Sequence, residues 1–162
     1  MKTAIYPGTF DPITFGHIDV IKKSLKIFDR VVVATTDNVN KNYHFSIDER
    51  LLIIKNSLFK DLRLNKKKIK IISFDTLTIN LCKKYNASVI IRGLRAVSDF
   101  EYEFQLAGMN KKLNSKIETM FLMSDIENQI ISSNFVKEIT KLEGNIKQFV
   151  TKSTVKMLKN KI

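Results

Sequence analysis

Residues 4–17 of the chain read Ala4-Ile5-Tyr6-Pro7-Gly8-Thr9-Phe10-Asp11-Pro12-Ile13-Thr14-Phe15-Gly16-His17. The apolar residues before Pro7 predict a short strand, and the turn-forming residues after it predict a loop that opens a helix. Backbone N–H groups and the positive end of the helix dipole face a ligand at such a helix start, and glycines let the chain approach a phosphate closely. The stretch therefore predicts an anion-binding loop.

Thr14 is the expected N-cap of this helix, because a threonine side chain can accept a hydrogen bond from a backbone N–H of the first turn. That cap places His17 in the first turn, where its ring can donate hydrogen bonds to phosphate oxygens. A loop of turn formers with a capping threonine and no ligand is the alternative, if the glycine pair is taken alone.

Short β-branched runs alternate with helical patterns along the rest of the chain, mostly without the strict alternation of a half-exposed strand. The predicted strands are Thr3–Tyr6, Val31–Thr35, Ile69–Ser73, Ser88–Ile91 and Glu118–Leu122, and the predicted helices are 17–28, 47–58, 76–85, 99–114, 133–141 and 152–161. Repeated strand–helix units predict an α/β fold, a doubly wound, Rossmann-like five-stranded parallel sheet in a single domain over residues 1–162. Ligands are expected at the carboxyl ends of its strands.

Two helix starts carry the pattern of a capping box, in which a serine and a glutamate three residues later satisfy each other's backbone donors. These are Ser46 with Glu49 and Ser98 with Glu101. The helix near 99–114 also has two apolar stripes, one through Phe100, Phe104 and Ala107 and one through Tyr102, Leu106, Met109 and Leu113. One stripe is enough for the core of the chain, so the second predicts a subunit contact, with a thick core as the alternative.

The composition is that of a globular protein, with 44% apolar residues, 5 glycines and 2 prolines in 162 residues. No apolar run approaches the roughly 20 residues that span a bilayer, and we expect a cytoplasmic protein without a membrane segment. The single cysteine, Cys82, is expected to be a small apolar side chain on a helix, since no histidine shares a recognisable motif with it.

The chain is basic, with 28 Lys and Arg against 16 Asp and Glu and a net charge of +12. Such a charge attracts polyanions, including RNA and anionic small molecules. The basic residues are scattered over loops and helix ends, however, and the interleaving of aromatic and basic residues that stacks RNA bases is absent. A lysine-rich solvated surface explains the charge at least as well as a nucleic-acid partner does, and such a partner is not expected.

Three further segments after predicted strands carry groups that suit phosphates. Lys41 lies in the polar loop after the second strand and offers a point charge. Arg92 and Arg95 flank Gly93 after the fourth strand and offer forked donors. The polar loop 123–134 opens a helix with hydroxyl and amide groups. The alternatives are a solvated lysine, surface arginines paired with nearby carboxylates, and residues that only cap a helix.

Thr14-Phe15-Gly16-His17 is similar to the Thr-x-Gly-His signature of the nucleotidyltransferase superfamily. Three blocks make the chain resemble the phosphopantetheine adenylyltransferase family over nearly its whole length. The first is Tyr6-Pro7-Gly8-Thr9-Phe10-Asp11-Pro12-Ile13-Thr14 with Gly16-His17, and two more follow. They are Ile91-Arg92-Gly93-Leu94-Arg95-Ala96-Val97 with Asp99-Phe100-Glu101-Tyr102-Glu103, and Ile131-Ser132-Ser133 with Val136-Lys137-Glu138. The resemblance implies transfer of AMP from ATP to 4′-phosphopantetheine, giving dephospho-coenzyme A and pyrophosphate. It also implies Mg²⁺ and a cytoplasmic homohexamer.

The same resemblance implies roles for individual residues. His17 would stabilise the transition state, with Lys41 and Arg95 as further catalytic residues. The substrate-binding positions are Thr9, Lys41, Thr78 and Arg92. The ATP-binding positions are Thr9, Phe10, His17, Gly93, Leu94, Arg95, Glu103, Asn128, Gln129, Ile130, Ile131, Ser132, Ser133 and Asn134. The chain departs from the family pattern at Asn128, where an aromatic is usual nearby, and at Asn134, where a third serine is usual.

The chemistry that the resemblance implies suits these residue types. A phosphate monoester is already ionised at neutral pH, so its attack needs no general base. The site must instead align the reactants and compensate the charge that builds up on the phosphates. No metal-ligand cluster is evident in the sequence, and Mg²⁺ would be held mainly by the ATP phosphates. A sister enzyme that uses nicotinate mononucleotide or glycerol 3-phosphate, and a basic nucleic-acid-binding protein, are the alternatives.

Overall fold

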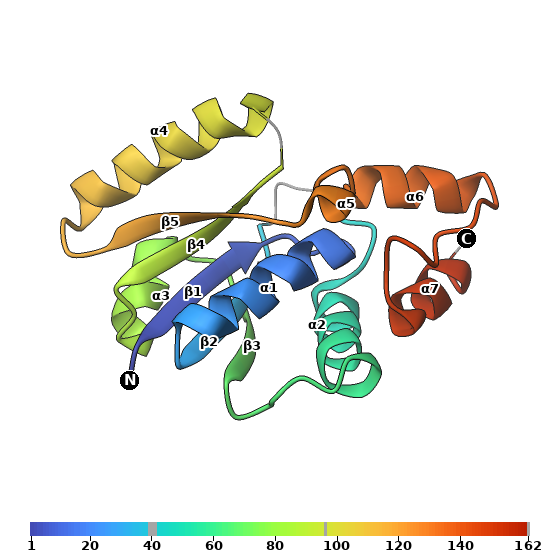
Figure 1. Cartoon of the computed structure of the whole chain (residues 1–162), viewed down its shortest axis with the longest axis horizontal. Coiled ribbons are helices and arrows are strands. Elements are labelled where there is room, and N and C mark those ends of the chain that lie inside the picture. The colour runs from blue at the N-terminus through green and yellow to red at the C-terminus, as the bar shows by residue number, and fades with distance from the viewer. Residues whose placement is uncertain (39–41, 96, 162) are drawn as a thin grey trace.

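The computed structural model describes residues 1–38, 42–95 and 97–161, without the side chains of residues 97–99. Its centre is a five-stranded parallel sheet in the order β3-β2-β1-β4-β5 (Figure 1). The strands are β1 (Thr3–Gly8), β2 (Arg30–Thr36), β3 (Ile69–Phe74), β4 (Val89–Leu94) and β5 (Glu118–Met123). The order reverses between β1 and β4, which is the doubly wound topology that the sequence predicts.

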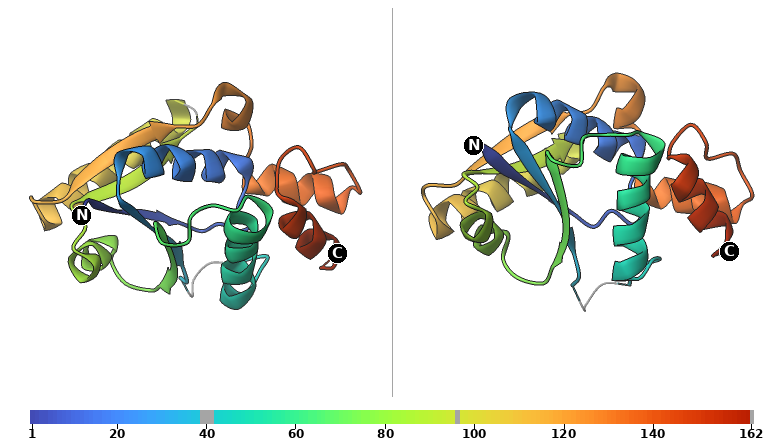
Figure 2. Two further views of the ribbon diagram at one scale, coloured as in Figure 1. Left: turned by 60° about the horizontal axis from the view of Figure 1, so that its bottom comes forward. Right: turned by 90° about the horizontal axis from the view of Figure 1, so that it is seen from below.

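Helices connect the strands and cover both faces of the sheet. They are α1 (Phe15–Ile27), α2 (Ile47–Lys55) with its π-helical continuation η1 (Asn56–Asp61), α3 (Thr78–Tyr85), α4 (Val97–Leu113), α5 (Ile126–Gln129), α6 (Ser133–Lys141) and α7 (Lys152–Lys159). Figure 2 shows α1 and α2 on one side of the strands and α3 on the other. In the described ranges, no helix has the length and apolar character needed to cross a membrane.

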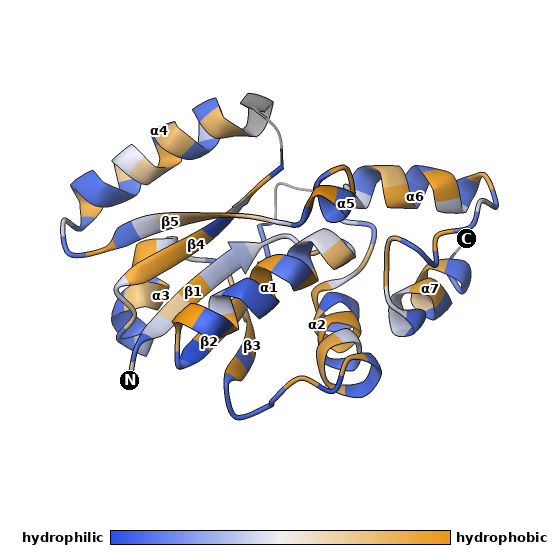
Figure 3. Cartoon of the chain, in the orientation of Figure 1, coloured by the Kyte–Doolittle hydropathy of each residue, from blue (hydrophilic) through white to orange (hydrophobic). Residues whose placement is uncertain are grey.

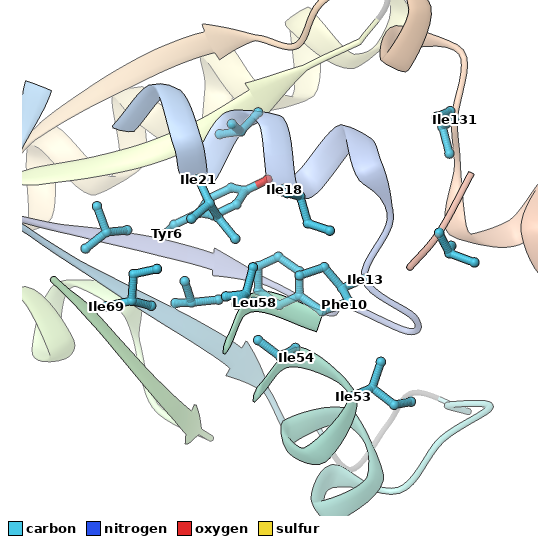
Figure 4. Packing of buried hydrophobic residues seen from close by; sticks show 14 of the residues in the cluster. Tyr6, Phe10, Ile13, Ile18, Ile21, Ile53, Ile54, Leu58, Ile69 and Ile131 are labelled. Carbon is cyan, nitrogen blue, oxygen red and sulfur yellow. The ribbon is translucent and has the colours of Figure 1, made fainter. Parts of the chain in front are cut away.

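Alternate residues of the central strands supply two separate cores. Tyr6 and Val33 belong to the larger one, between the sheet and the layer of α1 and α2, whereas Ile5 and Val32 belong to the smaller one under α3. Figure 4 shows the larger core beneath α1, where Ile18 and other apolar side chains meet residues of the sheet and of α2. Each fully buried aliphatic side chain contributes about 1.5–3 kcal/mol, so this core fixes the start of α1 relative to the end of β1.

Three local predictions are corrected by the structure. β4 continues through Arg92 and Gly93 to Leu94, because these residues still pair with β5, so they lie at the end of the strand rather than in the loop after it. α4 begins at Val97, and Ser98 is already helical, so it cannot be the N-cap that its spacing to Glu101 predicts. The segment 123–134, predicted as a polar loop, contains the four-residue helix α5.

The capping box of α2 is confirmed. Ser46 is its N-cap, and the Glu49 N–H donates to the Ser46 hydroxyl at 3.3 Å, while the Ser46 N–H donates to the Glu49 carboxylate at 2.8 Å. This box works because Ser46 has a non-helical backbone, with φ −59° and ψ 165°, which leaves its side chain free to face the first turn. The start of α2 is therefore set by local sequence.

The described residues of α4 are mostly exposed, and Figure 3 shows apolar as well as polar turns along this helix. Phe104 is 64% and Phe100 45% exposed, so the prediction that their stripe packs into the core of this chain is wrong. The reason is that α4 covers only the edge of the sheet formed by β4 and β5, where Phe100 contacts Phe121. The described part of α4 buries one side chain well, and that side chain is Glu103.

Candidate active site

A cavity of about 740 Å³ lies at the carboxyl ends of β1 and β4. The loop after β1, the first turn of α1, the end of β4, the middle of α4 and the start of α6 all contribute to it. The predicted site residues that line it are Thr9, Phe10, His17, Thr78, Arg92, Gly93, Leu94, Arg95, Glu103, Ile131, Ser132, Ser133 and Asn134. The fold thus brings together segments that are more than a hundred residues apart in the sequence.

The remaining predicted site residues lie elsewhere. Asn128, Gln129 and Ile130, in and just after α5, do not line the cavity. The backbone of Asn128 does lie against the first turn of α1, because a Cβ atom on Gly16 would come within 3.0 Å of the Asn128 carbonyl oxygen. Lys41 lies outside the described residues.

The ring of His17 is oriented by the start of its own helix. Thr14 is the N-cap of α1, as predicted. The backbone N–H of Thr14 donates to Nδ1 of His17 at 3.1 Å, and the Thr14 hydroxyl lies 3.0 Å from the same atom. Since a backbone N–H can only donate, Nδ1 carries no proton, and a neutral His17 holds its proton on Nε2. The histidine here takes the place that Glu or Gln has in a capping box.

The surroundings of His17 keep the ring uncharged. Burial lowers its pKa from 6.5 to about 4, and the positive charges of Arg95 and Arg92 act in the same direction. The ring also packs edge-on against Phe10, with 5.1 Å between the ring centres. At neutral pH His17 is therefore a fixed, neutral N–H donor on the wall of the cavity.

The loop after β1 is packed too tightly to adopt many conformations. The Phe10 ring lies under Gly8, where an added Cβ would come within 2.8 Å of the ring, so this position requires glycine. Phe10 itself has a φ of +47°, a region that residues with a side chain rarely occupy. Its ring is fully buried and packs edge-on against Tyr6. The geometry of Thr9 and Phe10 is thus fixed before any ligand arrives.

Arg92 is held at the end of β4 by two partners. Its Nε and Nη2 atoms donate to the two carboxylate oxygens of Glu103 at 2.7 Å and 2.5 Å, and its Nη1 atom donates to the Pro7 carbonyl at 3.0 Å. This forked pair ties α4 to the end of β1 through the sheet. The guanidinium therefore keeps a fixed position at the cavity wall. Both carboxylate oxygens of Glu103 accept hydrogen bonds from Arg92.

The start of α6 uses its hydroxyl groups to build the helix end. Ser132 is the N-cap and accepts a hydrogen bond from the Phe135 N–H at 3.1 Å. Ser133 donates its hydroxyl to the Pro12 carbonyl at 2.8 Å, which joins α6 to the loop after β1. The first turns of α1 and α6 both border the cavity, and both present positive dipole ends to it.

Two residues that brace the site were not predicted. Arg50 of α2 is fully buried and contacts the ends of β1 and β2. Asp11 accepts the N–H groups of His44 and Phe45 at 2.8 Å and 2.9 Å, which fixes the entry to α2. Neither role follows from the residue type, because an arginine inside a charged helix and an aspartate in a turn are usually solvated.

Carboxylates are scarce around the cavity. Glu103 and Glu138 are the acidic residues among those that line it, and Glu103 is already paired with Arg92. Within the described ranges, no group of three or more His, Cys, Asp or Glu residues could hold a metal ion. The cavity suits an anion whose charge is met by cations and oriented N–H groups.

The chain is similar to known proteins over almost its whole length. Residues 5–139 match the model of the cytidylyltransferase-like family. A phosphopantetheine adenylyltransferase of Pelagibacter ubique (strain HTCC1062) is 68% identical, over 99% of this chain and 98% of the relative. One from Wolbachia pipientis subsp. Culex pipiens (strain wPip) is 50% identical, over 98% of this chain and 92% of the relative. The chain belongs to the phosphopantetheine adenylyltransferase family. The predicted resemblance is confirmed.

Solved structures confirm the fold independently. A putative nicotinate-nucleotide adenylyltransferase from Vibrio parahaemolyticus superposes with a TM-score of 0.71 at 19% identity, covering 99% of this chain and 93% of that one. The nicotinic acid mononucleotide adenylyltransferase of Plasmodium falciparum gives a TM-score of 0.69 at 19% identity, covering 96% and 94%. At this identity the likeness concerns the arrangement of strands and helices. The Rossmann-like fold predicted from the sequence is the one that these proteins share.

Proposed function

We propose that the protein transfers the adenylyl group of ATP to the phosphate of 4′-phosphopantetheine, giving dephospho-coenzyme A and pyrophosphate. The observation that carries the proposal is the cavity lined by His17, Arg92 and Arg95 in a chain 68% identical to a phosphopantetheine adenylyltransferase. A cavity rich in N–H donors and poor in carboxylates suits a reaction between two phosphate esters, in which negative charge must be compensated throughout.

In the reaction an oxygen of the acceptor phosphate forms a bond to the α-phosphorus of ATP. The bond from that phosphorus to the bridging oxygen breaks, and pyrophosphate leaves with the electron pair. The acceptor oxygen carries no proton at neutral pH, so no residue has to act as a base. The protein has to align the reactants and to compensate their charge. Alignment alone can lower the activation barrier by about 7–11 kcal/mol.

His17 is placed to compensate charge at the α-phosphate. Its Nε2–H is held on the cavity wall because Nδ1 is engaged by Thr14. A neutral imidazole costs little to keep near the arginines, whereas a charged one would be repelled by them. We assign His17 the role of a fixed donor that strengthens its hydrogen bond as charge develops in the transition state.

The other predicted residues divide by substrate. Thr9, Lys41, Thr78 and Arg92 are assigned to the acceptor, and Arg95 with the segment Gly93–Leu94 to ATP, with Lys41 and Arg95 also assisting catalysis. Thr9, Phe10, Glu103 and the segment 128–134 complete the ATP site. Thr78, at the start of α3, and Arg92, at the end of β4, both border the cavity, which supports a shared role in the acceptor end.

Mg²⁺ fits this site as a companion of ATP. The described residues offer no cluster of ligands for the ion, whereas the triphosphate offers several oxygens. When bound, Mg²⁺ would neutralise charge on the phosphates of ATP. Glu138, which lines the cavity, is the side chain available to approach it, and the cationic residues would share the remaining charge.

We also propose that the protein is a cytoplasmic homohexamer. The exposed apolar residues of α4, with Tyr102 65% and Met109 61% exposed, support a contact between subunits on this helix. Leu106, a third residue predicted for this contact, lines the cavity. The proposed subunit contact and the site therefore share residues of the same helix. Covering α4 would restrict Glu103 and, through it, Arg92.

The function is tested by mixing the protein with ATP, Mg²⁺ and one acceptor at a time, and by measuring pyrophosphate. Pyrophosphate release is expected with phosphopantetheine and ATP. With nicotinate mononucleotide or glycerol 3-phosphate no release is expected, and replacing ATP by CTP should not change that result. Release with one of the other acceptors alone would overturn the acceptor assignment. No release with any of them, together with tight and steeply salt-dependent RNA binding, would favour a nucleic-acid-binding protein instead.

A further inference from the structure

Arg50 of α2 is a fully buried cation that reaches the turn after β1. Arginine is almost never fully buried unless it is paired, since moving the charge out of water is costly. Its Nη1 atom donates to the carbonyl oxygens of Thr36 at 2.7 Å and Thr9 at 3.1 Å. The side chain therefore joins the carboxyl ends of β1 and β2, next to the cavity but not lining it.

The remaining contacts hold the guanidinium in one orientation. Nη2 donates to the Asp37 carboxylate at 3.2 Å, and Nη1 lies 3.3 Å from the Thr35 hydroxyl. The Tyr43 ring lies over the guanidinium, with 3.8 Å to its centre, and contributes a cation–π contact. With these partners Arg50 behaves as a rigid part of the scaffold.

The Thr9 carbonyl is held by two donors, Arg50 Nη1 and the Thr35 hydroxyl, the second at 2.9 Å. The peptide bond from Thr9 to Phe10 is planar and trans, so the Phe10 N–H points in the direction opposite to that carbonyl. By holding the carbonyl, the two donors fix the direction of the N–H. They also hold Phe10 at its positive φ, which the chain would otherwise leave.

The Phe10 N–H makes no hydrogen bond to any residue that the structure describes. Buried backbone N–H groups are nearly always paired, and Phe10 is fully buried. Thr9 and Phe10 line the cavity, whereas Arg50 lies on the other side of this peptide. The unpaired N–H is therefore directed away from Arg50 and toward the place where a phosphate would bind.

We propose that Arg50 is a positioning residue that holds the Thr9–Phe10 peptide so that the Phe10 N–H donates to a phosphate oxygen of ATP. The identity of this ligand rests on the proposed function. A backbone donor fixed in advance compensates negative charge without rearranging during the reaction. The cost of burying Arg50 is offset by the carbonyl, hydroxyl and carboxylate groups around it, and its benefit appears in ligand binding.

Arg50 and the Thr35 hydroxyl, the two donors to the Thr9 carbonyl, are called the clamp below. Two variants of the clamp and one control distinguish an effect on positioning from an effect on stability. In Arg50→Lys an ammonium replaces the fork and cannot reach all the same acceptors. In Thr35→Val the second donor to the Thr9 carbonyl is removed while the β-branched shape is kept. The control is Ser57→Ala, which removes a buried hydroxyl that contacts Thr151 at 2.7 Å, away from the cavity.

ATP affinity, measured calorimetrically without acceptor, is the first readout. Arg50→Lys should weaken it about ten- to hundredfold, the range for losing a hydrogen bond to a charged group. Thr35→Val should also weaken ATP affinity, but less than Arg50→Lys does. Ser57→Ala should lower thermal stability and leave ATP affinity unchanged. If the two clamp variants lower stability as Ser57→Ala does and keep the affinity of the parent, the proposal is overturned.

The Phe10 amide gives a direct readout by NMR. Threonine labelled with ¹³C at the carbonyl and phenylalanine labelled with ¹⁵N select two amides, since only Phe10 and Phe15 follow a threonine. The Phe15 N–H already donates to the Phe149 carbonyl at 2.9 Å and serves as the internal control. On addition of ATP the Phe10 amide proton should move downfield by more than that of Phe15, and Arg50→Lys should reduce this movement.

If the chemical shift of the Phe10 amide proton did not change while ATP binds, the proposal would be overturned, even if the Arg50 variant did not fold. These measurements contain no acceptor, so they do not depend on which acceptor the protein uses. Failure to release pyrophosphate with phosphopantetheine would overturn the proposed function and leave the Phe10 result standing.

Discussion

The Nδ1 atom of His17 lies 3.1 Å from the backbone nitrogen of Thr14, and this contact determines which ring nitrogen faces the cavity. His17→Ala removes the donor and should lower turnover by roughly two to three orders of magnitude, the range seen when one transition-state donor is lost. ATP affinity should change little. Steady-state kinetics and calorimetry on the folded variant check both points.

Matched variants sharpen this test. His17→Gln keeps an acceptor for the Thr14 N–H and one N–H donor, so it should lose less activity than His17→Ala. His44→Gln alters the other histidine, which does not line the cavity, and should retain the turnover of the parent. Turnover of folded His17→Ala within about threefold of the parent would remove His17 from the catalytic role.

The protonation of His17 predicts a pH dependence of stability. Its pKa is lowered from 6.5 to about 4 in the folded chain, so the unfolded chain binds the extra proton first as the pH falls. The stability associated with His17 is therefore complete above about pH 6.5 and is lost between that value and about 4. Urea unfolding of the ligand-free protein over this range, compared with His17→Gln, measures the contribution. A His17 ring that titrates near pH 6.5 by NMR would contradict the account.

Arg92 and Glu103 are expected to act as one unit, because both carboxylate oxygens of Glu103 accept from Arg92. Arg92→Lys should raise the KM for phosphopantetheine more than the KM for ATP, since an ammonium cannot reproduce the fork. Glu103→Gln should raise the KM for phosphopantetheine through Arg92 as well as the KM for ATP, to which Glu103 is assigned, and for phosphopantetheine the double variant should be no worse than the more affected single one. A Glu103→Gln variant with a raised KM for ATP alone would show that Glu103 does not act through Arg92.

Assembly is predicted to depend on α4. Met109→Glu places a charge on its exposed apolar surface and does not alter a residue that lines the cavity. It should dissociate the proposed hexamer and weaken ATP binding. Light scattering gives the mass, and calorimetry gives the affinity. Ile27→Glu, a comparable change on α1, should do neither. A parent that is itself a monomer would refute the contact at once.

The sequence was informative where local chemistry decides the structure. β-branched runs marked all five strands, and Ser46 and Thr14 marked two helix starts, because capping depends on neighbouring residues. The sequence was less informative where pairing between strands decides the structure. The polar residues Arg92 and Gly93 continue β4 because β5 pairs with them, which no local pattern reveals.

The bracing of the site also escaped prediction. Arg50 and Asp11 act on segments about 30 to 40 residues away, and their types are usually solvated, so only the folded chain shows that they are buried. The apolar residues of α4 predicted a buried face, but the sheet ends at β5 and leaves Phe104 uncovered. Residues 93–95 lie at the cavity because they end or follow β4, and residues 131–134 lie there because they lead into α6, which Ser133 joins to the loop after β1.

Attack by the acceptor phosphate on the α-phosphorus of ATP can be followed with an oxygen isotope. Phosphopantetheine labelled with ¹⁸O in its phosphate is incubated with the protein, ATP and Mg²⁺, and the products are weighed by mass spectrometry. We predict that dephospho-coenzyme A retains all of the label and that the pyrophosphate carries none. Release of AMP with the label joined to the outer phosphates, or no product at all, would contradict the account.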